Sequence, residues 1–94
     1  MEITFDPKKS ESNLQKHGFP LADAKNLDWD GMVVFEDDRC DYGETRYIGL
    51  TYGIAYLADR IFSVCFTETN DFAACRIISL RLATKQEMRK YAEA

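Results

Sequence analysis

The sequence has few of the residues from which metal sites and disulfide frameworks are built. Its 94 residues include three cysteines and a single histidine, His17. Cys40, Cys65 and Cys75 are odd in number and show no C-x-x-C spacing, which argues against both a disulfide framework and a zinc site. We expect buried free thiols, although Cys65 and Cys75 could face each other across adjacent strands.

Glycine-rich loops and long apolar runs are also missing. The five glycines are scattered, so the chain has neither a nucleotide-binding loop nor the turn that surrounds an activated serine. No apolar run is long enough to span a membrane, and the start, MEITFDPKK, lacks the pattern of a secretory signal. We therefore expect a cytoplasmic protein, and we expect no metal ion and no cofactor.

The chain does contain enough apolar residues for one small domain. Hydrophobic residues make up 46% of the sequence. A chain of this length buries only about 60–65% of its unfolded surface, so we expect modest stability. We predict a single domain over residues 1–94.

Charge is unevenly distributed along the chain. The net charge is −4, but residues 1–44 have a balance of −6 and residues 45–94 a balance of +2. A solvated helix face is the simplest interpretation of the basic residues near the C-terminus. Arg76 and Arg81 lie in an apolar run, RIISLRLA, and a guanidinium stays charged, so each needs a carboxylate, solvent or a phosphate as its partner.

The order of predicted elements is β-α-α-β-β-β-β-α, an α+β fold with an antiparallel sheet. Asp6 followed by Pro7 marks a helix start and Gly18 its end, while Thr84 with Glu87 forms a capping box. Leu14 should be the main apolar anchor of the first helix. The predicted strands lie at 3–5, 32–36, within 46–58, at 60–69 and within 73–83, and the helices at 7–17, at 20–27 and from 85 onward, with a hairpin turn at 69–72.

The residue types present suit one reaction class in particular. Cleavage of RNA by its own 2′-hydroxyl needs a base for the hydroxyl proton, cations over the phosphate and an acid for the leaving oxygen. Arg, Lys, Glu, His and Tyr side chains can supply these functions without a cofactor. Because any small α+β domain contains such residues, composition alone does not establish this activity.

Three blocks of sequence resemble the BrnT family, the toxins of BrnT/BrnA toxin–antitoxin pairs. The blocks are FDPKKSESNLQKHGFPLADA, DYGETRYIG and RIISLRLATKQEMRKY, and they follow the family's order across nearly the whole chain. The matching positions are Asp6, Lys9, Asn13, Lys16, His17, Gly18, Gly43, Glu44, Arg46, Arg76 to Ser79, Arg81, Ala83, Glu87 and Tyr91.

The resemblance implies a RelE-like ribonuclease fold and an RNA-cleaving toxin that inhibits translation. It also implies neutralisation by a DNA-binding antitoxin of the BrnA type and a homodimer within a toxin–antitoxin heterotetramer. Thr69, Leu80 and Leu82 depart from the family pattern by removing positive charge or adding bulk near the expected phosphate site. The alternative is therefore a non-catalytic binding module of the same fold that acts only through its partner.

The candidate site residues follow from this reading. Glu44 would be the base, Arg46 a phosphate clamp and Arg81 the phosphate contact. Five residues separate Arg76 from Arg81, so a regular strand points them to opposite faces, whereas a bulge would place both on one face. Arg76 could instead hold Glu44. His17 is either a helix cap or catalytic, and Lys9 could approach the scissile phosphate, while the expected RNA-binding residues are Arg76, Lys85 and Arg89.

Overall fold

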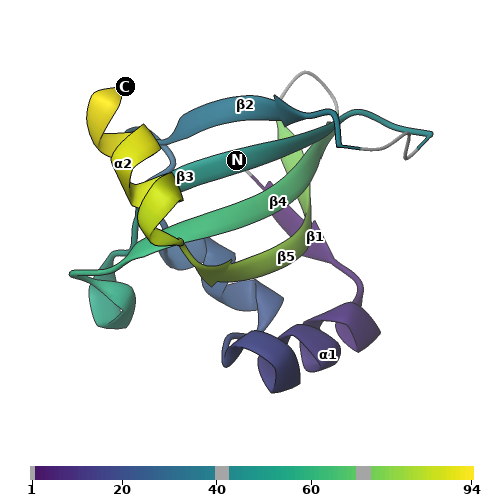
Figure 1. The fold of residues 1–94 in the computed structure, drawn as a ribbon. Helices are drawn as coiled ribbons and strands as arrows, with labels where there is room; N and C mark the ends of the chain where they lie inside the picture. Colours follow the sequence, from purple (N-terminus) through teal and green to yellow (C-terminus); the bar gives the residue numbers. More distant parts are fainter. Residues whose placement is uncertain (1, 40–42, 70–72) are drawn as a thin grey trace.

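The computed structural model describes residues 2–39, 43–69 and 73–94. Within them, strands form a five-stranded sheet in the order β1-β5-β4-β3-β2, with helix α2 on one side and the short 3-10 helix η1 on the other (Figure 1). The elements are β1 (Glu2–Phe5), α1 (Pro7–His17), η1 (Leu21–Asn26), β2 (Val33–Asp37), β3 (Arg46–Tyr52), η2 (Ala55–Leu57), β4 (Ile61–Thr69), β5 (Ala74–Leu82) and α2 (Lys85–Glu93). None of the helices in these ranges is long and apolar enough to cross a membrane.

The α+β class is confirmed, but the prediction of a purely antiparallel sheet is wrong. β1 pairs in parallel with β5, from Glu2 opposite Ala74 to Phe5 opposite Ile77, while the other three strand pairs are antiparallel. A tight turn forces two strands to run antiparallel, and no such turn joins β1 to β5, which are the first and last strands in the chain. The sheet is therefore mixed.

Helix α1 begins and ends where its capping residues predict. The Asp6 side chain accepts a hydrogen bond from the Lys8 amide, Pro7 takes the first helical position, and Gly18 ends the helix at φ 85°, where a residue with a Cβ is disfavoured. The prediction that Leu14 anchors the helix is wrong, because its side chain is 47% exposed. The buried residues of α1 are polar, Ser10 and Asn13.

Asn13 holds α1 against the sheet by acting as a short substitute for a strand. Its amide nitrogen donates to the Leu80 carbonyl at 2.8 Å and to the Phe19 carbonyl at 2.7 Å, and its oxygen accepts from the Leu80 amide at 3.1 Å. β1 covers β5 only as far as Ile77, so the Leu80 peptide would otherwise lie buried without a partner. Asn13 thus ties the polar helix to the sheet.

The second predicted helix, at 20–27, forms a 3-10 helix over Leu21–Asn26 instead of an α-helix. Its first amide, at Leu21, donates to the Ser10 hydroxyl of α1 at 2.9 Å, and Leu21 and Ala24 are completely buried. Three-ten geometry is common in short connecting pieces, where tertiary packing outweighs α-helical propensity. The remaining helix, α2, has the predicted Thr84–Glu87 capping box.

The two faces of the sheet differ in what covers them. The face that we call the core face packs against η1 and buries Phe62, Val64, Phe66, Cys75, Ile77 and Leu80. The opposite side, here called the α2 face, carries the smaller cluster of Ile48, Leu50 and Cys65, with Phe35, Ile78 and Tyr91 of α2 packed against it.

Cys65 and Cys75 do not face each other. Cys65 pairs with Ser79 and lies on the α2 face, whereas Cys75 pairs with Glu68 and lies on the core face. Both are buried free thiols, as expected, and burial raises the pKa of each. Cys40 and most of the predicted 69–72 turn lie outside the described residues.

Candidate functional site on the α2 face

A β-bulge in β5 places the two strand arginines on the same face. Arg76 pairs with Thr67 and Arg81 with Ser63, and the register shifts between Cys65 and Phe66, so one extra residue of β5 fits between them. Paired residues of an antiparallel ladder point to the same face of the sheet. Ser63, Cys65 and Thr67 are each two residues apart in β4, so all three point to the α2 face, where Cys65 lies. Both arginines therefore lie on the α2 face. Their partners Thr67 and Ser63 are four residues apart in β4, which corresponds to about 13 Å along the strand.

One end of the α2 face carries a cluster of three predicted site residues. Nη2 of Arg76 lies 2.8 Å from Oε1 and 2.7 Å from Oε2 of Glu44, and Nη2 of Arg46 lies 3.5 Å from Oε1 of the same carboxylate. The hydrogen bond from Arg76 is the main reason why the pKa of Glu44 is lowered. The prediction that Arg76 holds Glu44 is confirmed, and the low pKa makes Glu44 a weak base.

Arg81 forms a separate ion pair at the other end of β5. Its Nη1 and Nη2 donate to Oε1 and Oε2 of Glu87 at 2.7 and 3.1 Å, and Nη1 also contacts the Leu82 carbonyl at 3.2 Å. Oε1 of Glu87 additionally accepts the Thr84 amide at 2.9 Å, so a single carboxylate oxygen both caps α2 and neutralises Arg81. The Arg81 side chain is 32% exposed and remains accessible from the α2 face.

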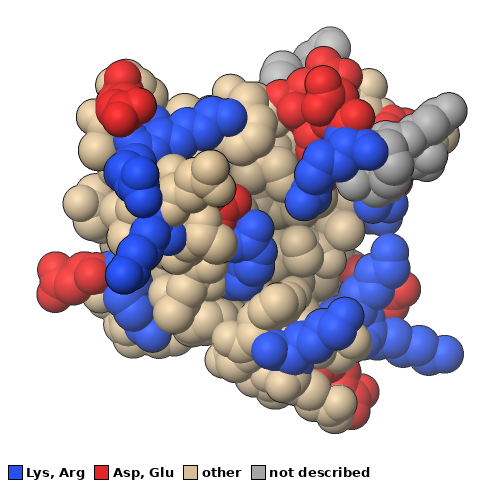
Figure 2. Space-filling model, viewed as in Figure 1, with Lys and Arg blue, Asp and Glu red and all other residues tan. Residues whose placement is uncertain are grey.

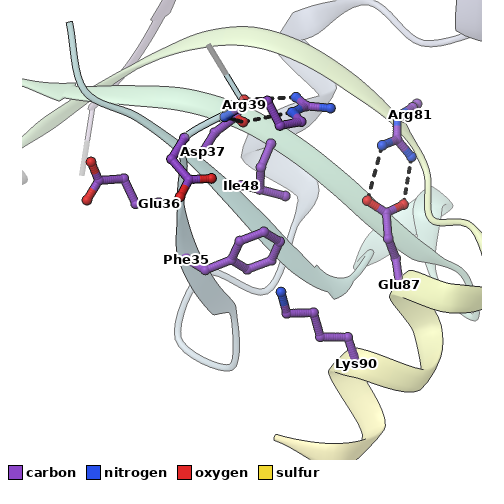
Figure 3. A pocket seen from close by; sticks show the side chains of 9 residues that line it. Phe35, Glu36, Asp37, Arg39, Ile48, Arg81, Glu87 and Lys90 are labelled. Carbon is purple, nitrogen blue, oxygen red and sulfur yellow. Dashed lines mark hydrogen bonds and ion pairs between the residues drawn. The ribbon is translucent and has the colours of Figure 1, made fainter. Parts of the chain in front are cut away.

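A cavity of about 400 Å³ lies beside Arg81, between α2 and strands β2 and β3. Ile48 and the Phe35 ring form its apolar wall, and the Arg81–Glu87 and Arg39–Asp37 ion pairs lie on different sides of it (Figure 3). Nζ of Lys90 is 3.5 Å from the centroid of the Phe35 ring. The remaining lining residues are Glu36 and Asp38.

A second, smaller cleft of about 160 Å³ separates α1 from β5. It is lined by Lys9, Ser12, Asn13, Lys16 and His17 from the helix and by Ile78 and Ser79 from the strand. Ser79 and Arg81 share the α2 face and are two residues apart, about 7 Å along the strand. The structure thus places His17 and Lys9 along the same stretch of β5 as Arg81, and the bonds of Asn13 to Leu80 fix that arrangement.

Lys85 and Arg89 are exposed on α2, none of whose nine residues, all of them described, is buried. Figure 2 shows lysine and arginine side chains distributed around the α2 side of the molecule, with acidic side chains beside several of them. The cations form several separate groups on this surface and not one continuous basic patch. Among the described residues, no group of His, Cys, Asp and Glu side chains is arranged to hold a metal ion.

Two of the three departures from the family pattern, Leu80 and Leu82, lie on the core side of β5. Leu80 is completely buried in the core cluster, and Leu82 pairs with the core-face residue Phe62. The expectation that Leu80 and Leu82 add bulk beside the phosphate site is therefore wrong. The hydroxyl of Thr69 donates to the Ala74 carbonyl at 3.2 Å across the β4–β5 pair.

Sequence reasoning missed most of the residues around the cavity, among them Phe35 and Asp37, and it missed the role of Glu87 as partner of Arg81. A signal for the last was present, because Glu87 is fixed at the third position of α2 by its capping box and the helix starts four residues after Arg81. Nothing local in the acidic stretch at 36–44 distinguishes Asp37 from its neighbours.

Arginine, lysine and histidine side chains thus line the two hollows along β5 of this small α+β protein. The family model described as "Ribonuclease toxin, BrnT, of type II toxin-antitoxin system" matches residues 5–87, and the chain belongs to this family. Membership implies an antitoxin as its partner. The comparison with curated proteins gave no match.

Proposed function

We propose that this protein is a metal-independent endoribonuclease of RelE-like fold that cleaves RNA on its α2 face and thereby inhibits translation in the cytoplasm. The observation that carries the proposal is the bulge between Arg76 and Arg81, because a bulge has a cost in strand pairing and here turns both guanidinium groups toward the same open face. The family description as a ribonuclease toxin supports catalysis over a non-catalytic binding module.

The proposed phosphate contact is Arg81. Arg81 lines the cavity, and Ser79, two residues before it, lines the α1 cleft. A backbone phosphate at this place could compete with Glu87 for the same two N–H donors. Arginine presents a planar fork of donors that suits a phosphate as well as a carboxylate. Lys9, which lines the neighbouring cleft, would add a second cation to the phosphate.

His17 is the better candidate for proton transfer. An imidazole can both accept and donate a proton, and His17 lines the cleft beside Ser79 of β5. Glu44 is a weaker base because the hydrogen bond from Arg76 lowers its pKa. We assign Glu44 to holding Arg46 and Arg76 at the far end of the face, where the two arginines, with Lys85 and Arg89 of α2, would contact flanking RNA.

We further propose that the antitoxin is a DNA-binding protein of the BrnA type and that two toxin chains associate within the complex. The exposed α2 surface and the unequal charge of the two halves of the chain are compatible with such a partner. Purification of the toxin with its antitoxin, followed by mass measurement in solution, would test both the partner and the stoichiometry.

The nuclease proposal is tested with purified protein, a structured RNA and excess EDTA. We expect cleavage that leaves a 2′,3′-cyclic phosphate, and Arg81→Ala should reduce the rate by about 100-fold, since one lost contact to transition-state charge has that size. Lys25→Ala removes an equal charge from an exposed site on η1 and should leave the rate unchanged. Intact RNA with wild-type protein, or equal rates for the two variants, would contradict the proposal.

A further inference from the structure

We propose that the cavity beside Arg81 is a nucleobase subsite that selects guanine next to the scissile phosphate. This inference rests on the proposed ribonuclease function and adds a base preference to it. The cavity volume of about 400 Å³ lies within the range of about 300–1,000 Å³ that is typical of small-molecule sites. Arg81 belongs to its wall, so a base in the cavity would place its own phosphate at that arginine.

The apolar wall suits the flat surface of a base. Phe35 and Ile48 are paired across β2 and β3 and lie side by side on the α2 face, where Figure 3 shows the Phe35 ring turned toward the middle of the cavity. Sequence-specific recognition of single-stranded RNA commonly stacks an unpaired base on an aromatic side chain. Trp29 and Phe66, by contrast, belong to the core cluster on the other face.

Lys90 covers the Phe35 ring in the free protein and can leave it. Its ammonium group is 3.5 Å from the ring centroid, on an exposed and flexible side chain. Base stacking on an aromatic ring is worth more than an exposed cation–π contact, so a base can take the place of Lys90 on Phe35. The displaced ammonium would then be close enough to the nucleotide to interact with its phosphate.

The polar groups of the cavity favour a base that donates hydrogen bonds. Four carboxylates line it, those of Glu36, Asp37, Asp38 and Glu87, against three cations, Arg39, Arg81 and Lys90. Asp37 and Glu87 already accept from Arg39 and Arg81. Glu36 pairs with Tyr47, which packs on the core face, so its side chain points away from the cavity. The exposed Asp38 carboxylate is therefore the acceptor that remains. Among the standard bases, guanine alone offers two adjacent N–H donors on its Watson–Crick edge, which match both oxygens of one carboxylate.

The first test measures binding of 3′-GMP, 3′-AMP and 3′-UMP to the full-length protein by titration calorimetry. We expect 3′-GMP to bind about tenfold more tightly than the other two, the size of one bidentate contact to a base. Asp38→Asn should remove this preference, and Phe35→Leu should weaken all three nucleotides. Asp30→Asn, an exposed carboxylate in the turn before β2, is the matched control and should keep the preference.

The second test maps the cleavage sites of wild-type protein and Asp38→Asn on an RNA with all four bases. Cleavage that is enriched beside guanine in the wild type and randomised in the variant supports the inference. Equal affinity for the three nucleotides, or cleavage with the same pattern in both proteins, overturns the subsite but leaves the nuclease standing. Selective binding of 3′-GMP without any cleavage supports the subsite and overturns the nuclease.

Discussion

The two faces of the sheet differ most clearly along β5, where neighbouring residues serve different purposes. Leu80 points into the core and is completely buried, whereas Arg81, the next residue, points to the α2 face and is 32% exposed. The core face consists of closely packed apolar side chains, whereas the α2 face carries ion pairs, small polar residues and two hollows around a smaller apolar cluster. Stability should therefore depend on the first face and RNA cleavage on the second.

Helix α2 completes this contrast. It lies over the α2 face without a single buried residue among its nine, and it contacts the sheet through the Arg81–Glu87 ion pair, the Lys90–Phe35 contact and an edge-to-face pair between Tyr52 and Tyr91. Exposed ion pairs and cation–π contacts contribute little free energy compared with a buried apolar side chain. The covering of the α2 face is thus much weaker than that of the core face.

The largest expected effect comes from the core face. Phe62→Ala removes a completely buried ring that packs edge-to-face on Phe19, with 5.1 Å between the two ring centroids. Such truncations reduce the free energy of unfolding by about 3–5 kcal/mol. Urea denaturation followed by circular dichroism measures this loss. Cleavage per folded molecule should remain at the wild-type level. A loss of activity in the folded fraction would contradict the claim that the core face serves stability and the α2 face serves cleavage.

Replacing Asn13 should affect both the stability of the protein and the cleavage rate. Asn13→Leu leaves the buried Leu80 peptide without its two hydrogen bonds, at a cost of about 2–4 kcal/mol, and it also frees the helix that carries Lys9 and His17. We expect both the unfolding midpoint and the cleavage rate to fall. Gln15→Leu, at an exposed position of the same helix, should change neither, and a stable but inactive Asn13→Leu protein would assign Asn13 a role in chemistry instead.

We expect acid to reduce the stability of the protein slightly through Glu87 on the α2 face. Burial opposes the ionisation of Glu87, but hydrogen bonds from Arg81 and Thr84 outweigh it, so the pKa of Glu87 is lowered in the folded protein. A lowered folded-state pKa stabilises the protein above the unfolded value of 4.5, and this stabilisation is lost as the pH falls through the folded-state pKa.

Thermal unfolding of wild-type protein and Glu87→Gln at several pH values measures how much the ionised Glu87 side chain contributes to stability. The wild type should be more stable by at most about 1 kcal/mol at neutral pH, because the pair is partly exposed, and the difference should shrink as the pH falls below 4.5. A difference that grows on acidification would show that Glu87 does not owe its ionisation to Arg81 and Thr84.

Much of the fold could be predicted from local sequence signals. Asp6 with Pro7, Gly18, and the Thr84–Glu87 pair each define a helix end through their own backbone bonds, and all three were correct. The parallel pairing of β1 and the 3-10 geometry of η1 were not predictable, because they depend on contacts between segments that are distant in the sequence.

The site was predictable as a set of residues but not as an arrangement. Arg76, Arg81 and Glu44 follow from their types and from the family pattern, and the pairing of Arg76 with Glu44 was correctly anticipated. The bulge that turns both arginines to one face depends on the register between β4 and β5, which no residue of β5 signals by itself. In α1 the apolar Leu14 is exposed and the polar Asn13 is buried, the reverse of the usual pattern. The cause is the partner of α1, which is the edge of a strand and not an apolar surface.

The most direct test of the central claim is a chemical-shift titration of the protein's backbone amides with a short RNA made resistant to cleavage by a 2′-deoxy substitution. If RNA binds the α2 face, the shifts should concentrate at His17, Ser79 and Arg81 and spare residues on the opposite side, such as Ala24 and Lys25 of η1. Shifts that concentrate on η1 while Ser79 and Arg81 stay unchanged would contradict the assignment of the α2 face as the RNA site.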